Sequence, residues 1–451
     1  EWAKFTALAW LPKNSGFLYS RFPQPEEGAA FQSLNSDHAI YLHLVGNDQG
    51  KDMQVYATPD QPELNHFAEL TSDKEWVVIT SSSGTDDRYE ITLIKVDAPK
   101  LETRKLVNGF ENDWRLIDGV GDTLYFVTNK DAPRLRVVKT DLSAEDPEFT
   151  ELVPESDAVI DGAMIVSDRL VISYLVDAKS QLSTFDLDGK GLGALELPGP
   201  GQVGGLSGSM KSDEGFFTFQ SFNRPTTVFR YDPSSAPTIW AAPTLPFDPD
   251  SVAVTQRFYE SKDGTRIPMF LVHMKDQDLS QGAPTMLYGY GGFNISVLPQ
   301  YKPAWMAWIK AGGVFASANL RGGGEYGKEW HDAGRLQNKQ NVFDDFIAAG
   351  EYLIDEGITP EKGLAIEGRS NGGLLIGAVM NQRPDLFAAG HAAVGVMDML
   401  RFDRFTAGRY WVDDYGYPNK DQDFQTLLGY SPYHNLKSGI DYPALIVSTA
   451  D

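Results

Sequence analysis

Short apolar runs of β type recur along the first half of the chain at nearly constant intervals, and this repeat constrains the fold more than any other feature. Five runs begin at Phe17, Trp76, Thr123, Val171 and Phe216, so their starts lie 59, 47, 48 and 45 residues apart. A partner run follows each one, beginning at Tyr41, Ile91, Arg134, Gln181 and Thr226. Paired strands at such intervals are typical of β-propeller blades, because each small sheet buries its faces only against its neighbours. A β-sandwich is the alternative, but it does not predict so regular a spacing.

The repeat ends in a proline-rich stretch around Thr238 to Pro249, and the pattern then changes. "RFYESKDGTRIPMFLVH" is typical of a hairpin with Asp263 and Gly264 at its turn. Residues 341–357 have helical apolar spacing and end at Gly357, while "YPALIVSTAD" at the end of the chain is expected to form a buried strand. Strands that alternate with helices predict a mostly parallel, doubly wound α/β sheet. We therefore predict a partial propeller over residues 1–248 and an α/β domain over residues 249–451.

The segment "LAIEGRSNGGLLIGAVM", from Leu364 to Met380, contains a G-x-S-x-G pattern between an expected strand and an expected helix. This is the pattern of a nucleophile elbow, in which small flanking residues allow a sharp turn that presents the serine hydroxyl. Ser370 is then the candidate nucleophile. In a chain with 43 glycines the pattern also fits an ordinary glycine-rich turn, so the α/β context decides in favour of the elbow.

Composition excludes several classes of function. The chain has 451 residues, enough for two or three domains, and a net charge of −23, which argues against a nucleic-acid or anionic-membrane partner. It has no cysteine, so it can form neither a disulfide framework nor a thiolate metal site. No apolar run is long enough to span a membrane, and the N-terminal residues lack the basic start of a signal peptide. The compartment, cytoplasmic or periplasmic, stays undetermined.

Six ordered blocks in the second half resemble the prolyl oligopeptidase family, serine peptidases that join a propeller to an α/β-hydrolase domain. The blocks are "LYGYGGFNIS" at 287–296, "NLRGGGEYG" at 319–327, "GRSNGGLL" at 368–375, "NQRPDLF" at 381–387, "GVMDMLRF" at 395–402 and "DDYGYP" at 413–418. The resemblance is dense from about Tyr259 onward and only architectural across the propeller. Arg369 is a mild departure, because glycine is as frequent there in the family. The resemblance implies no cofactor and no metal.

The resemblance also implies a set of site residues. Ser370 is the expected nucleophile, and the backbone N–H of Asn371 is the expected first oxyanion donor. The phenol of Tyr290 is the expected second donor, although a core aromatic is the alternative. For a proline-sized specificity pocket the resemblance indicates Phe293, Val396, Trp411 and Tyr415, with Trp411 flat against the pyrrolidine ring. Each of these four residues could instead belong to the ordinary core.

The base and the acid of the catalytic triad are expected outside this sequence. In this fold the order is serine, acid and histidine, and only His391 and His434 follow Ser370. His391 comes too early, and His434 precedes the last expected strand. The family pattern puts the acid two residues beyond Asp451 and the histidine later still. We therefore expect a chain cut at both ends, which alone should not hydrolyse peptides because serine is a weak nucleophile without a base.

The favoured function is a serine endopeptidase that cleaves short peptides after proline while the propeller restricts access to small substrates. A related propeller-bearing peptidase is the alternative, either an oligopeptidase for basic residues or a dipeptidyl or acylaminoacyl peptidase. A noncatalytic propeller scaffold is the third possibility, but a scaffold needs neither an elbow nor an oxyanion pair. We expect short proline-containing peptides as partners, a monomeric protein, and neither nucleic acid nor membrane.

Overall fold

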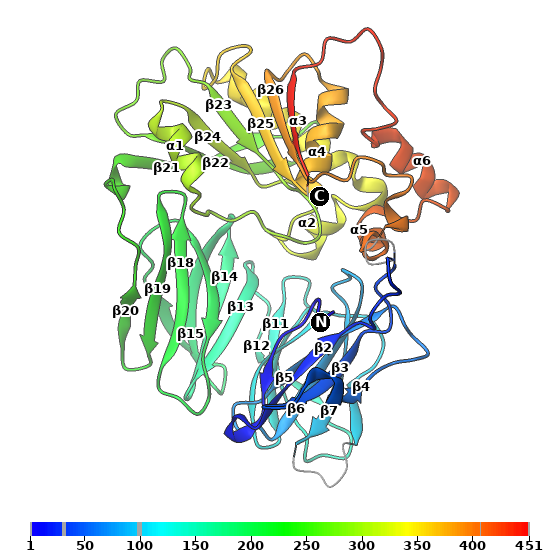
Figure 1. Ribbon diagram of the computed structural model, residues 1–451. Helices are drawn as coiled ribbons and strands as arrows, with labels where there is room; N and C mark the ends of the chain where they lie inside the picture. The colour runs from blue at the N-terminus through cyan, green and yellow to red at the C-terminus, as the bar shows by residue number, and fades with distance from the viewer. Residues whose placement is uncertain (1, 29–32, 97–101, 406, 450–451) are drawn as a thin grey trace.

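The computed structural model describes residues 2–28, 33–96, 102–405 and 407–449. Figure 1 shows a set of small β-sheets in the lower part of the molecule and one larger sheet with helices above them. The small sheets come from the first half of the chain, and the larger sheet comes from the second half. Both parts contribute residues to the candidate site described below.

The described residues of the first half form five antiparallel sheets of four strands each, built from strands that follow one another in sequence. The first sheet contains β1 (Ala9–Trp10), β2 (Gly16–Arg21), β3 (Ala39–Leu44) and β4 (Met53–Tyr56), and the second contains β5 (Leu64–Leu70), β6 (Trp76–Ser83), β7 (Tyr89–Lys95) and β8 (Thr103–Val107). The third contains β9 (Trp114–Val120), β10 (Thr123–Thr128), β11 (Arg136–Asp141) and β12 (Phe149–Val153). The fourth contains β13 (Val159–Val166), β14 (Arg169–Val176), β15 (Lys179–Asp186) and β16 (Gly191–Leu195), and the fifth contains β17 (Gln202–Ser207), β18 (Gly215–Ser221), β19 (Arg224–Asp232) and β20 (Ser235–Ala241).

The paired runs found in the sequence are the second and third strands of these sheets. In the fourth sheet, for example, the two runs correspond to β14 and β15, which pair antiparallel over their whole length. The outermost strands carry mainly exposed residues, as in β16 and β20, so they lack the apolar signal of the inner pair. The predicted blade repeat is therefore confirmed. Each blade has four strands, of which the sequence pattern showed the two apolar ones.

The second half forms a seven-stranded sheet with the order β21-β22-β24-β23-β25-β26-β27. Its strands are β21 (Val252–Glu260), β22 (Arg266–Met274), β23 (Thr285–Tyr288), β24 (Val314–Ala318), β25 (Leu364–Arg369), β26 (Ala389–Ala393) and β27 (Ala444–Ser448). The pairs from β24 through β27 are parallel, whereas β21 and β22 form the predicted antiparallel hairpin. Gly264 lies in the hairpin turn with φ 82°, a conformation that favours glycine.

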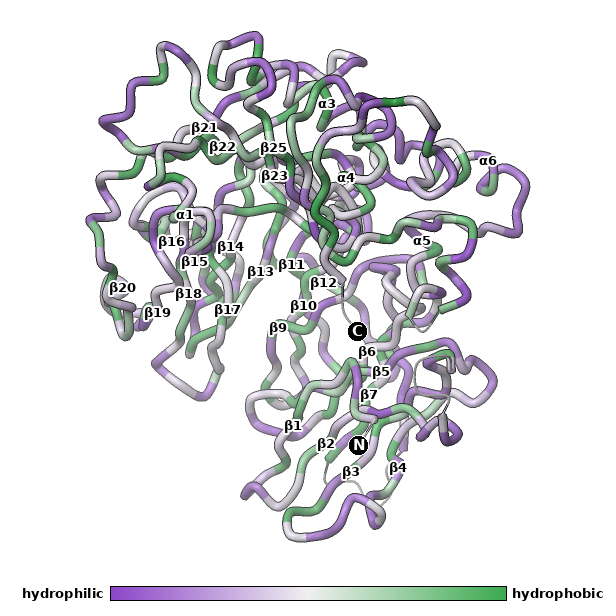
Figure 2. The backbone as a smooth tube through the Cα atoms, turned by 45° about the horizontal axis from the view of Figure 1, so that its top comes forward, coloured by the Kyte–Doolittle hydropathy of each residue, from purple (hydrophilic) through white to green (hydrophobic). Residues whose placement is uncertain are grey.

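Helices cover both faces of this sheet. They are α1 (Pro303–Lys310) on one face and α3 (Gln340–Asp355) and α4 (Asn371–Gln382) on the other. The second half also contains α2 (Lys328–Asp332), α5 (Val412–Tyr415), α6 (Asp421–Tyr430), η3 (Pro249–Ser251), η4 (Leu336–Asn338), η5 (Phe402–Arg404) and η6 (Gly408–Trp411), while η1 (Pro12–Asn14) and η2 (Gln49–Lys51) lie in the first propeller sheet. Leu271 and Ile366 pack with α3 and α4 on one face. Phe270 and Phe315 alternate to the other face, where they pack with α1 and with propeller residues. Figure 2 shows hydrophobic stretches along the strands of the sheet and hydrophilic stretches in the outer loops.

The predicted helix at 341–357 corresponds to α3, and Gly357 follows it with φ 69°. The last predicted strand also forms, as β27, and pairs in parallel with β26. The prediction that it is buried is wrong, because all five of its residues are exposed. The physical reason is its place at the edge of the seven-stranded sheet in the described part of the chain. The boundary between residues 248 and 249 stays a prediction.

Candidate active site

Ser370 lies at the sharp turn between β25 and α4. Its backbone has φ 58° and ψ −116°, which is a strained conformation for a residue other than glycine. The flanking glycines permit this turn, because a Cβ at Gly368 would come within 2.2 Å of the carbonyl oxygen of Gly372. The Ser370 N–H donates to the carbonyl of Ala393 at 2.8 Å and so ties the turn to the end of β26. The segment therefore has the strand–turn–helix geometry of an elbow.

Two hydrogen-bond donors lie beside Ser370. Tyr290 follows β23, and its phenol hydrogen-bonds with the Ser370 side chain. Burial above all, followed by the charge of Asp414, raises the pKa of this phenol to about 12, although the bond with Ser370 lowers it. The phenol is therefore protonated at neutral pH and can donate. Asn371 is the first residue of α4, so its N–H has no acceptor within the helix.

A pocket of about 380 Å³ opens beside Ser370. It is lined by Thr85, Tyr290, Phe293, Ile295, Ser370, Val396, Trp411 and Tyr415. Six of these eight residues are among those predicted from the sequence, so the structure brings them together around one cavity. The seventh predicted residue, Asn371, supports the pocket from behind: its side chain donates to the carbonyl of Tyr290 at 2.6 Å and accepts from the Tyr415 hydroxyl at 3.0 Å. The individual roles stay predictions.

Aromatic rings form much of the pocket wall. The rings of Phe293 and Tyr415 meet edge to face, with centroids 5.3 Å apart and an angle of 86°. Phe402 lies nearly parallel to Trp411 at 6.4 Å, which supports that ring from one side. Flat rings held in fixed orientations form a slot that suits a small, rigid, apolar group.

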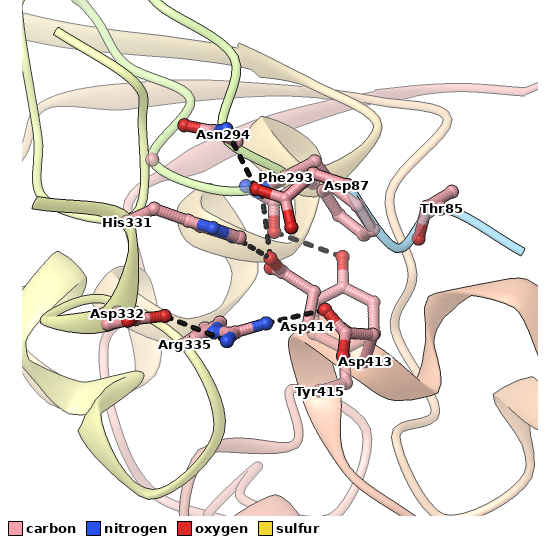
Figure 3. Close-up of polar contacts among 12 residues, drawn as sticks. Thr85, Asp87, Phe293, Asn294, His331, Asp332, Arg335, Asp413, Asp414 and Tyr415 are labelled. Carbon is pink, nitrogen blue, oxygen red and sulfur yellow. Dashed lines mark hydrogen bonds and ion pairs between the residues drawn. The ribbon is translucent and has the colours of Figure 1, made fainter. Parts of the chain in front are cut away.

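A buried polar cluster lies beneath the Phe293 loop (Figure 3). The carboxylate of Asp414 accepts from the backbone N–H of Phe293 at 3.0 Å and contacts Nε2 of His331 at 2.8 Å. Lys339, which is only 1% exposed, donates to the carbonyl of Gly291 at 2.9 Å and to Oδ1 of Asn371 at 3.1 Å, and its Nζ lies 3.5 Å from Asp414. This cluster connects the loop that carries Tyr290 and Phe293 to the elbow and to α5.

The charges of this cluster depend on one another. Burial raises the pKa of Asp414, but the Lys339 ammonium, His331 and the Phe293 N–H outweigh burial and hold that pKa below its ordinary value. Burial lowers the pKa of Lys339, although the Asp414 carboxylate opposes this effect. The Asp414 carboxylate therefore stays charged because of its partners, and through the same contacts it holds these partners in place.

The sequence reasoning missed five residues of the site. They are Thr85, Ile295, His331, Lys339 and Asp414. Ile295 and Asp414 lie inside the blocks "LYGYGGFNIS" and "DDYGYP", so a signal for them was present. Thr85 had none, because it belongs to the propeller and lies 325 residues before its partner Tyr410.

The two histidines that follow Ser370 lie elsewhere. His391 is in β26, with Nε2 3.1 Å from Oγ of Ser448, and His434 has Nδ1 2.8 Å from Oγ of Ser431. Among the residues that the structure describes, no histidine lines the pocket. The predicted base and acid beyond residue 451 stay predictions.

Two kinds of site can be judged for residues 2–28, 33–96, 102–405 and 407–449. Within these ranges no group of three or more histidine, cysteine, aspartate or glutamate side chains could hold a metal ion. Within the same ranges no helix combines the length and the apolar character needed to cross a membrane.

Two family models match the chain. The model described as "Prolyl oligopeptidase, N-terminal beta-propeller domain" matches residues 1–242, and the model "Prolyl oligopeptidase family" matches residues 299–451. The prolyl endopeptidase of Elizabethkingia miricola is 38% identical over 454 residues, which cover 99% of this chain and 63% of the relative. The prolyl endopeptidase of Dictyostelium discoideum is 36% identical and covers 100% of this chain and 63% of the relative. The chain thus spans about 63% of the length of these curated relatives.

Solved structures give the same result. Prolyl oligopeptidase B from Galerina marginata, bound to a 25mer macrocyclization substrate, has a TM-score of 0.94 and 32% identity, covering 99% of this chain and 63% of its own. A chain from a study of two prolyl endopeptidases has a TM-score of 0.93 and 38% identity, covering 100% and 66%. Oligopeptidase B from Leishmania major has a TM-score of 0.86 and 26% identity, covering 98% and 63%.

Proposed function

The chain belongs to the prolyl oligopeptidase family, which joins a β-propeller to an α/β-hydrolase domain, and from this premise we propose that the protein is a serine endopeptidase. It hydrolyses short peptides on the C-terminal side of proline. The observation that carries the proposal is one cavity of about 380 Å³ that joins Ser370, the Tyr290 phenol and an aromatic wall containing Trp411. These groups correspond to a nucleophile, an oxyanion donor and a binding slot.

The proposed reaction begins when Oγ of Ser370 attacks the carbonyl carbon of the scissile amide and forms an acyl-enzyme after the amine leaves. The negative charge that develops on the carbonyl oxygen is stabilised by the Asn371 N–H and the Tyr290 O–H. A base takes the Ser370 proton and gives it to the leaving amine, and the expected base is the histidine predicted beyond residue 451. Water then hydrolyses the ester and regenerates the serine.

The proposed specificity comes from the shape of the pocket. A pyrrolidine ring is rigid and apolar, so it loses little conformational freedom when it binds between Phe293 and Trp411. A longer charged side chain would lose much of its hydration in this slot, and none of the eight lining residues carries an opposite charge to compensate. We propose that the propeller adds a second level of selection by admitting only short peptides to the face that carries the pocket.

The test is a panel of fluorogenic peptides that differ only in the residue before the cleaved bond, assayed with the full-length protein. We expect kcat/KM for proline to exceed that for alanine or arginine by at least about tenfold. A fluorophosphonate should label Ser370, and Ser370→Ala should lose labelling and lower kcat by as much as about 10⁶-fold. Ser156→Ala, an exposed propeller substitution, is the matched control. Equal turnover of proline and arginine reporters, or normal turnover by Ser370→Ala, would contradict the proposal.

A further inference from the structure

The turn between β6 and β7, residues 84–88, extends from the propeller to the candidate pocket. Figure 3 shows Thr85 and Asp87 of this turn facing Phe293 and Tyr415 of the α/β domain. Thr85 itself lines the pocket. The turn contacts two separate segments of the α/β domain, and each segment carries one aromatic wall residue.

The first contact fixes the segment that carries Trp411. The N–H of Thr85 and its Oγ1 both donate to the carbonyl of Tyr410, at 3.3 and 2.8 Å. Gly84 has φ 60°, and a Cβ there would lie 2.9 Å from Cα of Tyr410. The two backbone segments therefore approach as closely as glycine allows. The Tyr410 hydroxyl donates to the carbonyl of Asn35 at 2.7 Å, which gives this residue a second propeller partner. Tyr410 directly precedes Trp411 in η6, so the position of Tyr410 fixes the backbone from which the Trp411 side chain extends.

The second contact fixes the segment that carries Phe293. Nδ2 of Asn294 donates to Oδ2 of Asp87 at 3.2 Å. Phe293 has φ 57°, which is unfavourable for a bulky residue and needs external support, whereas the φ of 54° at Asn294 is one that asparagine tolerates. Asp414 supports this loop from the α/β side through the Phe293 N–H, and Asp87 supports it from the propeller side.

An ion pair adds to the first of these two contacts. The Arg88 guanidinium lies 3.7 Å from Asp413, which is two residues beyond Trp411. Asp413 also pairs with Arg335 of the α/β domain. The segment from Tyr410 to Asp413 is therefore held by the propeller on both sides of Trp411.

We propose that the β6–β7 turn is a specificity-determining element that fixes the spacing between the Phe293 and Trp411 walls. Thr85 and Asp87 are positioning residues: they act on the substrate through the two aromatic rings. Because a rigid ring makes contact with both walls only at one separation, a small shift of either wall should weaken binding of proline more than binding of alanine. This inference rests on the proposed function of the pocket.

The test uses Thr85→Val, which keeps the branched shape and removes the hydroxyl donor, and Asp87→Ala, which removes the acceptor for Asn294. For each variant we expect KM for a proline reporter to rise about threefold to tenfold, as the loss of one hydrogen bond allows, with kcat within twofold. The alanine reporter should change by less than twofold, so the preference for proline falls. Thr85→Ser, which restores the donor, should restore this preference. Thr150→Val is the matched control, because the Thr150 hydroxyl also donates to a carbonyl, at 3.2 Å, but within a propeller blade.

The outcomes separate this inference from the proposed function. If the unmodified protein shows no preference for proline, the proposed function fails, and the inference fails with it. If the unmodified protein prefers proline and both variants keep its full preference, only the role of the β6–β7 turn is wrong. An equal loss of activity toward both reporters would also overturn it, since that result indicates a general structural role.

Discussion

Replacing Glu325 by glutamine should remove a pH-dependent contribution to the stability of the α/β domain. Glu325 lies in the glycine-rich loop before α2 and is 1% exposed. Its Oε1 accepts from the N–H of Val297 at 2.8 Å and from Nδ2 of Asn319 at 3.3 Å. Burial raises the pKa of this carboxyl from 4.5 to about 7, although these hydrogen bonds oppose the rise. A glutamine keeps an oxygen acceptor for Val297 and does not titrate.

The sign and the size of the effect follow from the pKa. Below about pH 4.5 both folded and unfolded chains hold the proton, and the stabilisation is fully present. As the pH rises toward 7, the unfolded chain releases the proton first, so the free energy of unfolding falls. The difference between 4.5 and about 7 corresponds to roughly 3 kcal/mol, because one pKa unit is about 1.4 kcal/mol. For a domain of about 200 residues this changes Tm by about 6 to 12 °C.

The assay is thermal unfolding of the protein and of Glu325→Gln, followed by fluorescence between pH 4.5 and 8. We expect Tm of Glu325→Gln, relative to the unmodified protein, to rise by about 6 to 12 °C across this interval. Glu329→Gln is the matched control, since Glu329 is an exposed residue four positions further along the chain. The plot of Tm against pH for this variant should stay parallel to that of the unmodified protein. Parallel curves for Glu325→Gln would refute the reasoning, because they would mean that Glu325 titrates alike in both states.

Three further results are expected. Tyr290→Phe should lower kcat about 10 to 1000-fold without a change in fold, if the phenol donates to the oxyanion; an unchanged rate in the peptide assay would limit Tyr290 to packing. Lys339→Met should lower the free energy of unfolding by about 3 to 5 kcal/mol, because it leaves the buried Asp414 carboxylate without its ammonium; denaturant unfolding measures this, and a change below 1 kcal/mol would contradict it. Gly368→Ala should abolish fluorophosphonate labelling of Ser370, because the new Cβ would meet Gly372 at 2.2 Å; normal labelling would show that the turn relaxes.

The parts of the fold that the sequence predicted are those that local patterns determine. The inner strands of each blade are apolar because neighbouring blades cover them, and the elbow needs glycines within a few residues of Ser370. The outer strands were missed because residues such as those of β20 face solvent and carry no apolar signal. For β27 the sequence predicted the strand correctly but not its exposure, since an edge position depends on the whole sheet.

In the candidate site too, the sequence predicted what local patterns determine and missed what depends on the whole fold. The family resemblance indicated every residue of the pocket wall except Ile295 and Thr85. Ile295 lies within one of these blocks, whereas Thr85 reaches the pocket only because the propeller packs against the α/β domain. Lys339 also escaped prediction, since a lysine at the start of α3 resembles an ordinary surface residue until the fold buries it. Contacts between distant segments are therefore what the sequence alone did not provide.

The pocket is held mainly by directional polar contacts, and this determines which substitutions it should tolerate. Its loops contain strained residues such as Phe293, which apolar packing alone does not hold in one conformation. Asp414 and Lys339 supply directed partners for these loops, whereas core residues such as Phe346 contribute volume. A core accepts apolar exchanges of similar volume at small cost, but a buried charge that loses its partner is strongly destabilising. The shape of the pocket should therefore depend more on Asp414 and Lys339 than on the larger apolar core that surrounds them.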